Sequence, residues 1–217
     1  MAKGDERMYV VDRSVRFMRG FVSSYAPSSI KKLFWDREFS SGHWDFLDDT
    51  ADDCVYQHLE RYAKNGCILD LGCGPGNTAN ELADTAYASY VGVDISEAAL
   101  RKARERTEVN GRSHKHTFVQ GDFLGYQPAQ KFDVILFRES LYHVPMGKIK
   151  TVLNRYSEYL RDRGVLMVRI GTMQDGKPKR RPLAMIGIIE KDFDVVEKNQ
   201  YARGATVIVF RPTAYVT

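Results

Sequence analysis

Three acidic residues and one glycine-rich turn are the parts of this sequence whose types and spacing could do chemistry. Asp70 stands just before the turn GCGPGN, Asp94 ends the segment SYVGVD, and Asp122 lies in VQGDF. Three glycines alternate along the turn, namely Gly72, Gly74 and Gly76. Glycine adopts positive φ readily and lets a ligand approach the backbone closely. We therefore expect the turn and the three acids to form a site for a nucleoside.

The glycine spacing argues against a ligand with phosphates. A dinucleotide site expects G-x-G-x-x-G, whereas this turn has G-x-G-x-G and places Asn77 where the third glycine belongs. Asp70 would be unfavourable beside a pyrophosphate but favourable beside a cation. Asp94 lies 22 residues after Gly72, the spacing at which an acid accepts hydrogen bonds from ribose hydroxyls. Asp122 can accept from an exocyclic amine such as that of adenine. Three acids and no lysine around such a site indicate a cationic ligand without phosphates, and S-adenosylmethionine fits.

The chain resembles the class I (Rossmann-like) S-adenosylmethionine-dependent methyltransferases over about residues 66–170. Its ILDLGCGPGN is similar to the family's first motif, YVGVDIS to the segment with the ribose-binding acid, and VQGDF to the segment with the adenine-binding acid. FDVILFRESLYHVP resembles the segment after the fourth strand that faces methionine and substrate, and LRDRGVLMVRI resembles the fifth-strand motif. The resemblance implies a methyltransferase with S-adenosyl-L-methionine as its cofactor.

The resemblance also implies where the methionine part of the cofactor lies. Asp70 would line it, and Gly72 and Gly74 would do so through close backbone contact. The backbone of Phe137 and Arg138 would meet its ammonium.

The adenosine part is implied to lie on the next two strands. Asp94 would bind the ribose, and Ile95 would pack on the adenine. Asp122 would take the adenine amine, with the Phe123 amide nearby. The full set assigned to the cofactor is Asp70, Gly72, Cys73, Gly74, Gly76, Asn77, Asp94, Ile95, Asp122, Phe123, Phe137 and Arg138.

The elements that must position these residues alternate between strand and helix patterns. Helical patterns occupy about 49–64, 77–86, 96–110 and 148–162, and a short apolar segment lies at 182–190. We expect strands at 67–71, 89–94, 116–120, 132–137, 164–170, 193–199 and 206–212. Alternating strands and helices indicate a doubly wound parallel sheet, but the last two strands are joined only by the short link YARGA, which fits a hairpin. The expected fold is α/β, a mostly parallel seven-stranded sheet with a C-terminal antiparallel hairpin.

Candidates for the chemical step lie in RESLYHVP. Glu139, Tyr142 and His143 are spaced i, i+3, i+4, which would group them on one side of a helical turn at the mouth of the site. Histidine has a suitable unperturbed pKa, near 6.5, although His143 could instead fix the loop. A base is optional, because methyl transfer gains most from holding the reacting atoms in line.

The N-terminal part has no motif that we can place. We expect residues 1–60 to be a helical, aromatic-rich segment over the substrate and residues 61–217 to be the cofactor-binding domain. Five aromatic residues of this segment could form a lid or could simply pack its helices, namely Phe34, Trp35, Phe39, Trp44 and Phe46.

Composition, charge and cysteine content limit the partners, the location and the metal sites that we expect. The 217 residues carry a net charge of +4, and the sharpest basic run is KPKRR at 177–181, which is either a solvated loop or a contact for RNA. No apolar run is long enough to span a membrane, and no secretory signal is visible, so we expect a cytoplasmic protein. The three cysteines form no CxxC pair, so we expect no zinc or other metal site, and Cys73 is interpreted as a small filler of the turn.

The favoured function is methylation of a small-molecule acceptor at oxygen or nitrogen. The alternative is an RNA or protein methyltransferase that uses the basic run, although the N/D-P-P-Y/F signature of many such enzymes is absent after the fourth strand. A non-catalytic cofactor-binding homologue and an NAD-linked oxidoreductase are less favoured, because all three acids are present and the third glycine is not. The oligomeric state is left open.

Overall fold

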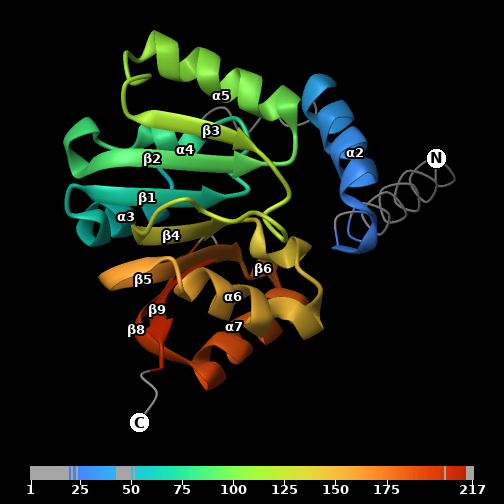
Figure 1. Ribbon diagram of the computed structural model, residues 1–217. Helices are drawn as coiled ribbons and strands as arrows, with labels where there is room; N and C mark the ends of the chain where they lie inside the picture. Colours follow the sequence, from blue (N-terminus) through green and yellow to red (C-terminus); the bar gives the residue numbers. More distant parts are fainter. Residues whose placement is uncertain are drawn as a thin grey trace, which may run out of the picture.

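The sheet of the computed structural model has the expected topology (Figure 1). The structure describes residues 20, 22, 24–42, 50, 52–202 and 204–213. Seven strands lie in the order β3-β2-β1-β4-β5-β9-β8, and the first five are parallel. β9 runs antiparallel to both β5 and β8. The strands are β1 (Gly66–Leu71), β2 (Tyr87–Asp94), β3 (His116–Gln120), β4 (Phe132–Arg138), β5 (Leu160–Gly171), β8 (Phe193–Gln200) and β9 (Ala205–Pro212). The predicted mostly parallel sheet with a C-terminal hairpin is confirmed.

Helices cover both faces of the sheet, which is why its strands read as nearly continuous apolar runs. The helices α3 (Val55–Ala63), α4 (Asn77–Glu81) and α5 (Glu97–Val109) lie on one side, and α6 (Ile149–Ser157) and α7 (Arg180–Asp192) lie on the other. In Figure 1, α6 and α7 are in front of the lower strands.

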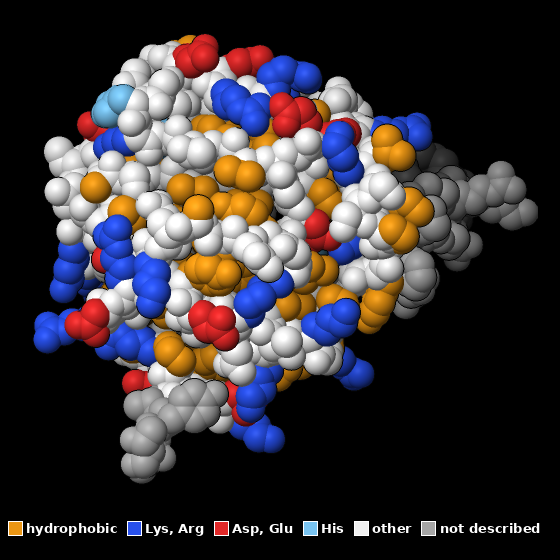
Figure 2. All heavy atoms as spheres, in the orientation of Figure 1, with side chains coloured by type: hydrophobic (Ala, Val, Ile, Leu, Met, Phe, Trp, Pro, Cys, Tyr) orange, Lys and Arg blue, Asp and Glu red, His pale blue; other side chains and the backbone are white. Residues whose placement is uncertain are grey.

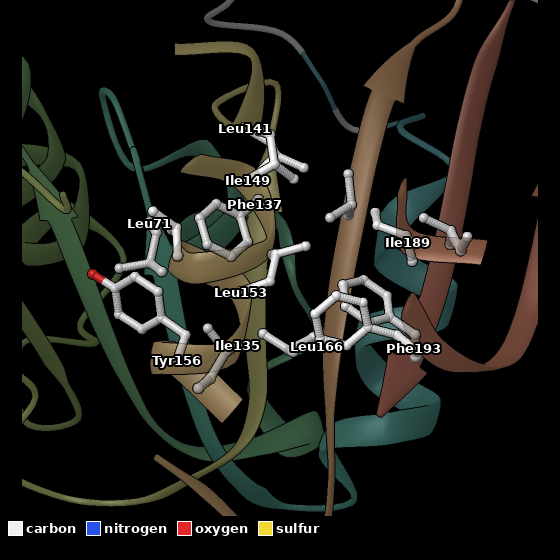
Figure 3. Packing of buried hydrophobic residues seen from close by; sticks show 14 of the residues in the cluster. Leu71, Ile135, Phe137, Leu141, Ile149, Leu153, Tyr156, Leu166, Ile189 and Phe193 are labelled. Carbon is white, nitrogen blue, oxygen red and sulfur yellow. The ribbon is translucent and has the colours of Figure 1, made fainter. Parts of the chain in front are cut away.

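The two cores follow from the alternation of side chains along each strand. Figure 3 shows one core, in which Phe137 of β4 lies among Leu71, Leu153 and Tyr156. Leu136, the neighbouring residue of β4, faces the other core with Leu59 of α3. All six side chains are fully buried, so the ends of β1 and β4 are rigidly placed.

Several helix boundaries differ from the sequence prediction. The predicted helix 77–86 divides into α4 and the 3₁₀ turn Asp84–Ala86, because Leu82 adopts an extended ψ and Arg112 donates to its carbonyl oxygen. The predicted helix 148–162 stops at Ser157, because the chain already pairs with Phe132 of β4 from Leu160 onward. The apolar segment at 182–190 is part of α7.

The helix predicted over 49–64 begins, within the described residues, at Val55. Asp53 accepts a hydrogen bond from the Val55 amide at 3.0 Å and so caps the helix. The chain then turns at Lys64 and Asn65, which both have positive φ, as the predicted stop at Asn65-Gly66 requires.

The helix α2 (Ser28–Ser40) crosses the carboxyl ends of the strands (Figure 1). Its Asp36 accepts hydrogen bonds from the Ser96 hydroxyl at 2.9 Å and from the Ala98 amide at 3.2 Å, both at the start of α5. This contact satisfies free donors of the α5 N-terminus. Among the described residues, no helix combines the length and the apolar character needed to cross a bilayer.

Candidate functional site

A cavity of about 500 Å³ lies at the carboxyl ends of β1, β2 and β4, beneath α2. This is where ligands bind in open α/β sheets. Of the residues predicted from the sequence, those that line it are Asp70, Gly72, Cys73, Gly74, Asn77, Asp94, Ile95, Asp122, Phe123, Arg138, Glu139, Tyr142 and His143. Gly76 and Phe137 do not line it. The Phe137 side chain points into the core instead (Figure 3).

The three glycines of the turn all have positive φ, but they serve different contacts. A Cβ on Gly72 would lie 2.6 Å from the Ser140 Cβ, and a Cβ on Gly76 would lie 2.7 Å from the Ala103 Cβ of α5. Both glycines therefore allow close packing within the protein. A Cβ on Gly74 would meet only Phe39, at 3.8 Å, so Gly74 is the glycine that leaves room for a ligand.

Cys73 packs inside the turn. A Cβ added to Gly92 would lie 2.8 Å from the Cys73 Sγ, so the thiol occupies the space that Gly92 leaves. Burial raises the pKa of this thiol above its ordinary value, which keeps it protonated. These contacts agree with its interpretation as a filler.

Asp70 is a buried carboxylate at the end of β1. Its Oδ2 accepts a hydrogen bond from the Tyr90 hydroxyl at 2.6 Å, and its Oδ1 has no hydrogen-bond partner among the described residues. Burial raises the pKa of Asp70 to about 6, although the Tyr90 hydrogen bond works in the opposite direction. A buried carboxylate oxygen that lines a cavity without a donor is a place for a cationic or hydrogen-bonding ligand.

Asp94 is the second buried carboxylate, at the end of β2. Its Oδ2 accepts from the Gly74 amide at 2.8 Å, and its Oδ1 accepts from the Ser96 amide at 2.9 Å. Burial raises its pKa to about 6 against the effect of these backbone amides. Asp94 lines the cavity, and each carboxylate oxygen can accept more than one hydrogen bond, so both could still accept from a diol.

Asp122 is tied to α2. Its Oδ2 accepts from the Ser28 hydroxyl at 2.9 Å and from the Lys31 ammonium at 3.1 Å, and the Lys31 side chain is only 8% exposed. The expectation of a site without lysine is therefore wrong, since Lys31 and Lys179 both line the cavity. The sequence does not predict these two lysines as cavity residues, because they lie in segments outside the strand motifs.

The three residues predicted for the chemical step all line the cavity, but they do not share a helical turn. The 3₁₀ helix η3 spans only Leu141–His143, and Glu139 precedes it with a positive φ of 51°. This conformation is strained for a residue with a side chain. Glu139 forms an ion pair with Arg169, and its amide donates to the Arg169 carbonyl oxygen at 2.9 Å.

His143 and Tyr142 stand against each other and against α2. Their ring centroids are 4.6 Å apart, and the His143 ring is 5.2 Å from the Trp35 ring. Burial, together with the charges of Arg181 and Lys31, lowers the pKa of His143 to about 4. Burial raises the pKa of Tyr142 well above its ordinary value. Both side chains are therefore uncharged at neutral pH.

An ion-pair network lies at the other end of the cavity. The sequence does not predict it. Asp53 accepts from Arg138 at 2.8 Å and from Arg169 at 3.2 Å, and its side chain is 7% exposed. Burial opposes ionisation, yet the charges of the two arginines lower the pKa of Asp53 below its ordinary value. Lys179 also lines this end. No short motif predicts the group, because its members come from the start of α3, from β4, from β5 and from the residue before α7.

The roof of the cavity includes Trp35 and Phe39 of α2, whose rings lie 6.1 Å apart. Trp44 and Phe46 lie outside the described residues. Asp36 and Lys31 fasten α2 to the start of α5 and to Asp122.

The basic run at 177–181 is not simply a solvated loop. Two short strands, β6 (Met173–Gln174) and β7 (Lys177–Pro178), pair around a turn at Asp175 and Gly176, and Lys179 follows at the cavity. Arg181 donates to the Val144 carbonyl oxygen at 3.0 Å. On the face shown in Figure 2, Lys and Arg side chains are scattered among apolar and acidic ones instead of forming one stripe.

Comparison with known proteins agrees with this geometry. Residues 68–164 match the family model described as a methyltransferase domain. The chain is 31% identical over 116 residues to Sterol 24-C-methyltransferase erg6 of Aspergillus fumigatus, a match that covers 53% of this chain and 30% of that protein. It is 30% identical over 165 residues to Carboxy-S-adenosyl-L-methionine synthase of Desulfotalea psychrophila, covering 70% of this chain and 67% of that protein. The chain thus spans about 30% of the length of the sterol methyltransferases that it matches.

The fold has close counterparts among solved structures. The N-methyltransferase NodS from Bradyrhizobium japonicum, in complex with S-adenosyl-L-homocysteine, superposes with a TM-score of 0.63 at 20% identity. The match covers 84% of this chain and 98% of that one.

Proposed function

This chain belongs to the class I (Rossmann-like) S-adenosylmethionine-dependent methyltransferases, and from that premise we propose that it methylates a small-molecule acceptor at oxygen or nitrogen by in-line displacement. One observation carries the proposal. The carboxylates of Asp70 and Asp94 lie in the same cavity as Glu139, Tyr142 and His143. The groups that we assign to the cofactor and to the acceptor thus share one cavity.

The residues present fit S-adenosylmethionine, which supplies a methyl group on a sulfonium when it is bound. Asp70 offers a buried oxygen without a donor, and Asp94 offers lone pairs for a diol. The Gly74 position leaves open space that a side chain would fill. Asp70, Asp94 and Asp122 are the residues that we assign to the cofactor's cationic, ribose and adenine parts.

The chain contributes to the chemistry by positioning the reacting groups within the cavity. Holding the reacting groups in line is worth up to about 7–11 kcal/mol. The rings of Trp35, Tyr142 and His143 line the cavity, and we assign to them the exclusion of water from the acceptor. His143 is uncharged at neutral pH, so it can accept a proton or a hydrogen bond there, whereas Tyr142 retains its proton and can donate.

We also propose that residues 1–60 act as the substrate roof and residues 61–217 as the cofactor-binding domain. The described part of the roof supports this, because Trp35 and Phe39 line the cavity while their helix is held by Asp36 and Lys31. A cavity of about 500 Å³ suits a small ligand.

The test is binding followed by labelling. Calorimetry should detect S-adenosyl-L-homocysteine and not NAD. The protein should then transfer labelled methyl from S-adenosylmethionine to a metabolite filtrate and not to RNA or protein fractions. Label recovered in RNA or protein would favour the alternative class of acceptor, and binding of NAD alone would refute the assignment.

A further inference from the structure

Lys179 is a cation of the cavity whose ammonium has no partner among the described residues. Its side chain lines the cavity and is half-buried. No hydrogen bond or ion pair of its ammonium is formed with any described residue, whereas its backbone amide donates to the Thr172 carbonyl oxygen at 2.8 Å. A half-buried ammonium has lost part of its hydration, so a site for an anion beside it is favourable.

The neighbouring charges do not neutralise Lys179. Arg138 and Arg169 share the carboxylate of Asp53, and Arg169 also pairs with Glu139. Both carboxylates of this group are therefore already occupied by arginines. Lys179 is the cation of this group that pairs with no carboxylate of the described residues.

The backbone around Lys179 leaves room for a ligand. A Cβ on Gly171 would lie 3.4 Å from the Lys179 Nζ and 3.4 Å from a Glu139 oxygen, so the absent side chain leaves the ammonium accessible from the cavity. Lys179 is also the residue before α7, a helix of 13 residues, and the positive end of that helix adds to the field.

This cation is separated along the sheet from the cofactor acids. Asp70 and Asp94 lie at the ends of β1 and β2, and Asp122 follows β3, whereas Arg169 belongs to β5 and Lys179 follows it. The β4 strand lies between the two groups. The adenosine part of the cofactor therefore lies away from Lys179. The anions that can reach Lys179 are a carboxylate of the acceptor and the carboxylate of the cofactor's own methionine part, and the test below distinguishes the two.

We infer that the acceptor carries a carboxylate, which binds between Lys179 and Arg169 and anchors the molecule while another of its atoms receives the methyl group. The inference rests on the proposed function and names the substrate class of that same site. A monoanion matches the single positive charge of Lys179.

The test uses three carboxylate probes, namely benzoate, cinnamate and glutarate, and their uncharged amides. Each is titrated by calorimetry into the full chain saturated with S-adenosyl-L-homocysteine. Lys179→Met removes the charge and keeps the length of the side chain, and Lys177→Met is the matched control at an exposed position of β7. We expect at least one carboxylate to bind more tightly than its amide, and Lys179→Met to weaken it about tenfold or more. Lys177→Met should leave its affinity unchanged.

The outcomes separate this inference from the proposed function. S-adenosyl-L-homocysteine must bind the wild type and Lys179→Met equally, which also shows that the variant is folded. If it binds but no carboxylate is preferred over its amide, or if Lys179→Met does not weaken the carboxylate, the inference is overturned and the proposed function stands. If Lys179→Met weakens S-adenosyl-L-homocysteine instead, Lys179 serves the cofactor and the inference is overturned. Failure of the wild type to bind S-adenosyl-L-homocysteine refutes the proposed function itself.

Discussion

The two ends of the cavity are built in opposite ways. At one end, the carboxylates of Asp70 and Asp94 are buried, accept from backbone amides or a tyrosine hydroxyl, and have pKa values raised to about 6. At the other end, Asp53 is equally buried but is held between two arginines, and its pKa is lowered. Burial alone does not decide the charge state of a carboxylate here.

The difference indicates a division of tasks. The carboxylates of Asp70 and Asp94 form no ion pair with a side chain of the described residues. A cation or a further hydrogen-bond donor that enters the cavity should therefore stabilise their ionised forms beyond what the present hydrogen bonds provide. The carboxylate at the basic end is already satisfied, so it stabilises the protein irrespective of any ligand. Substitutions at the two ends should therefore separate binding from stability.

The largest expected effect is on stability at the basic end. Asp53→Ala leaves Arg138 and Arg169 without their shared carboxylate and removes the cap of α3. We expect the free energy of unfolding to fall by about 3–5 kcal/mol, the range for removal of one partner of a buried ion pair. Denaturant unfolding followed by circular dichroism measures this.

The neighbouring acid provides the control. Asp52 is exposed, so Asp52→Ala should change the free energy of unfolding by no more than about 0.5 kcal/mol. Equal effects at the two positions would show that the Asp53 network does not stabilise the protein.

The acidic end could be predicted from the sequence because each of its residues follows a strand directly. An apolar run followed by Asp70 or Asp94 places the acid at the carboxyl edge of a parallel sheet, and the glycine turn lies beside it. The mostly parallel character of the sheet follows from the same alternation of strands and helices, whereas the order of its strands comes from the structure.

The basic end could not be predicted in this way. Asp53 and Arg169 are 116 positions apart and meet only after α3 packs on the sheet. Lys179 belongs to the basic run at 177–181. The sequence of such a run does not show which of its side chains faces the interior of the protein. Lys31 was missed for the same reason, since helix α2 has no apolar face that would orient it from the sequence.

The second prediction tests whether Asp94, at the acidic end, binds the ribose of the cofactor. Asp94→Asn keeps an oxygen acceptor for one backbone amide but removes the charge that a ribose diol would bind. We expect the affinity for S-adenosyl-L-homocysteine to fall tenfold or more, since a hydrogen bond to a charged group is worth about 1.5–3 kcal/mol. The free energy of unfolding should change far less than in Asp53→Ala. An unchanged dissociation constant would show that Asp94 is not the ribose acid, and Glu105→Gln, on the exposed side of α5, is the control for loss of an acidic charge.

The third prediction concerns pH. The pKa values of Asp70 and Asp94 in the free protein are raised to about 6, and a cationic ligand favours their ionised forms. Binding therefore releases protons near pH 6, and affinity for S-adenosylmethionine should be constant above about pH 7 and fall below pH 6, by up to about tenfold per pH unit for each group. His143, with its pKa lowered to about 4, stays uncharged over this range and adds nothing.

The stability of the ligand-free protein changes with pH in the opposite direction to the ligand affinity. A carboxyl group whose pKa is higher in the folded state binds protons more strongly when folded, so these two acids make the ligand-free protein less stable as pH rises from about 4 to 6. Calorimetry from pH 5 to 8 in two buffers with different ionisation heats measures the released protons. Affinity that does not change over this range would contradict the charge states described for Asp70 and Asp94.

The smallest expected effect concerns the roof that covers both ends. Trp35 lines the cavity and packs against His143, and the sequence contains only one other tryptophan, Trp44. Trp35→Phe keeps an aromatic ring, so the loss in S-adenosyl-L-homocysteine affinity should be no more than about 1 kcal/mol, in the range of one aromatic pair. The intrinsic fluorescence of the wild type should change when the ligand binds, and the variant should lose most of that change. Tyr25 precedes α2 and is 60% exposed, so Tyr25→Phe should keep the full change in fluorescence. A signal that persists in Trp35→Phe would come from Trp44 and would mean that the ligand does not reach Trp35, so the assignment of α2 to the roof would lose its support.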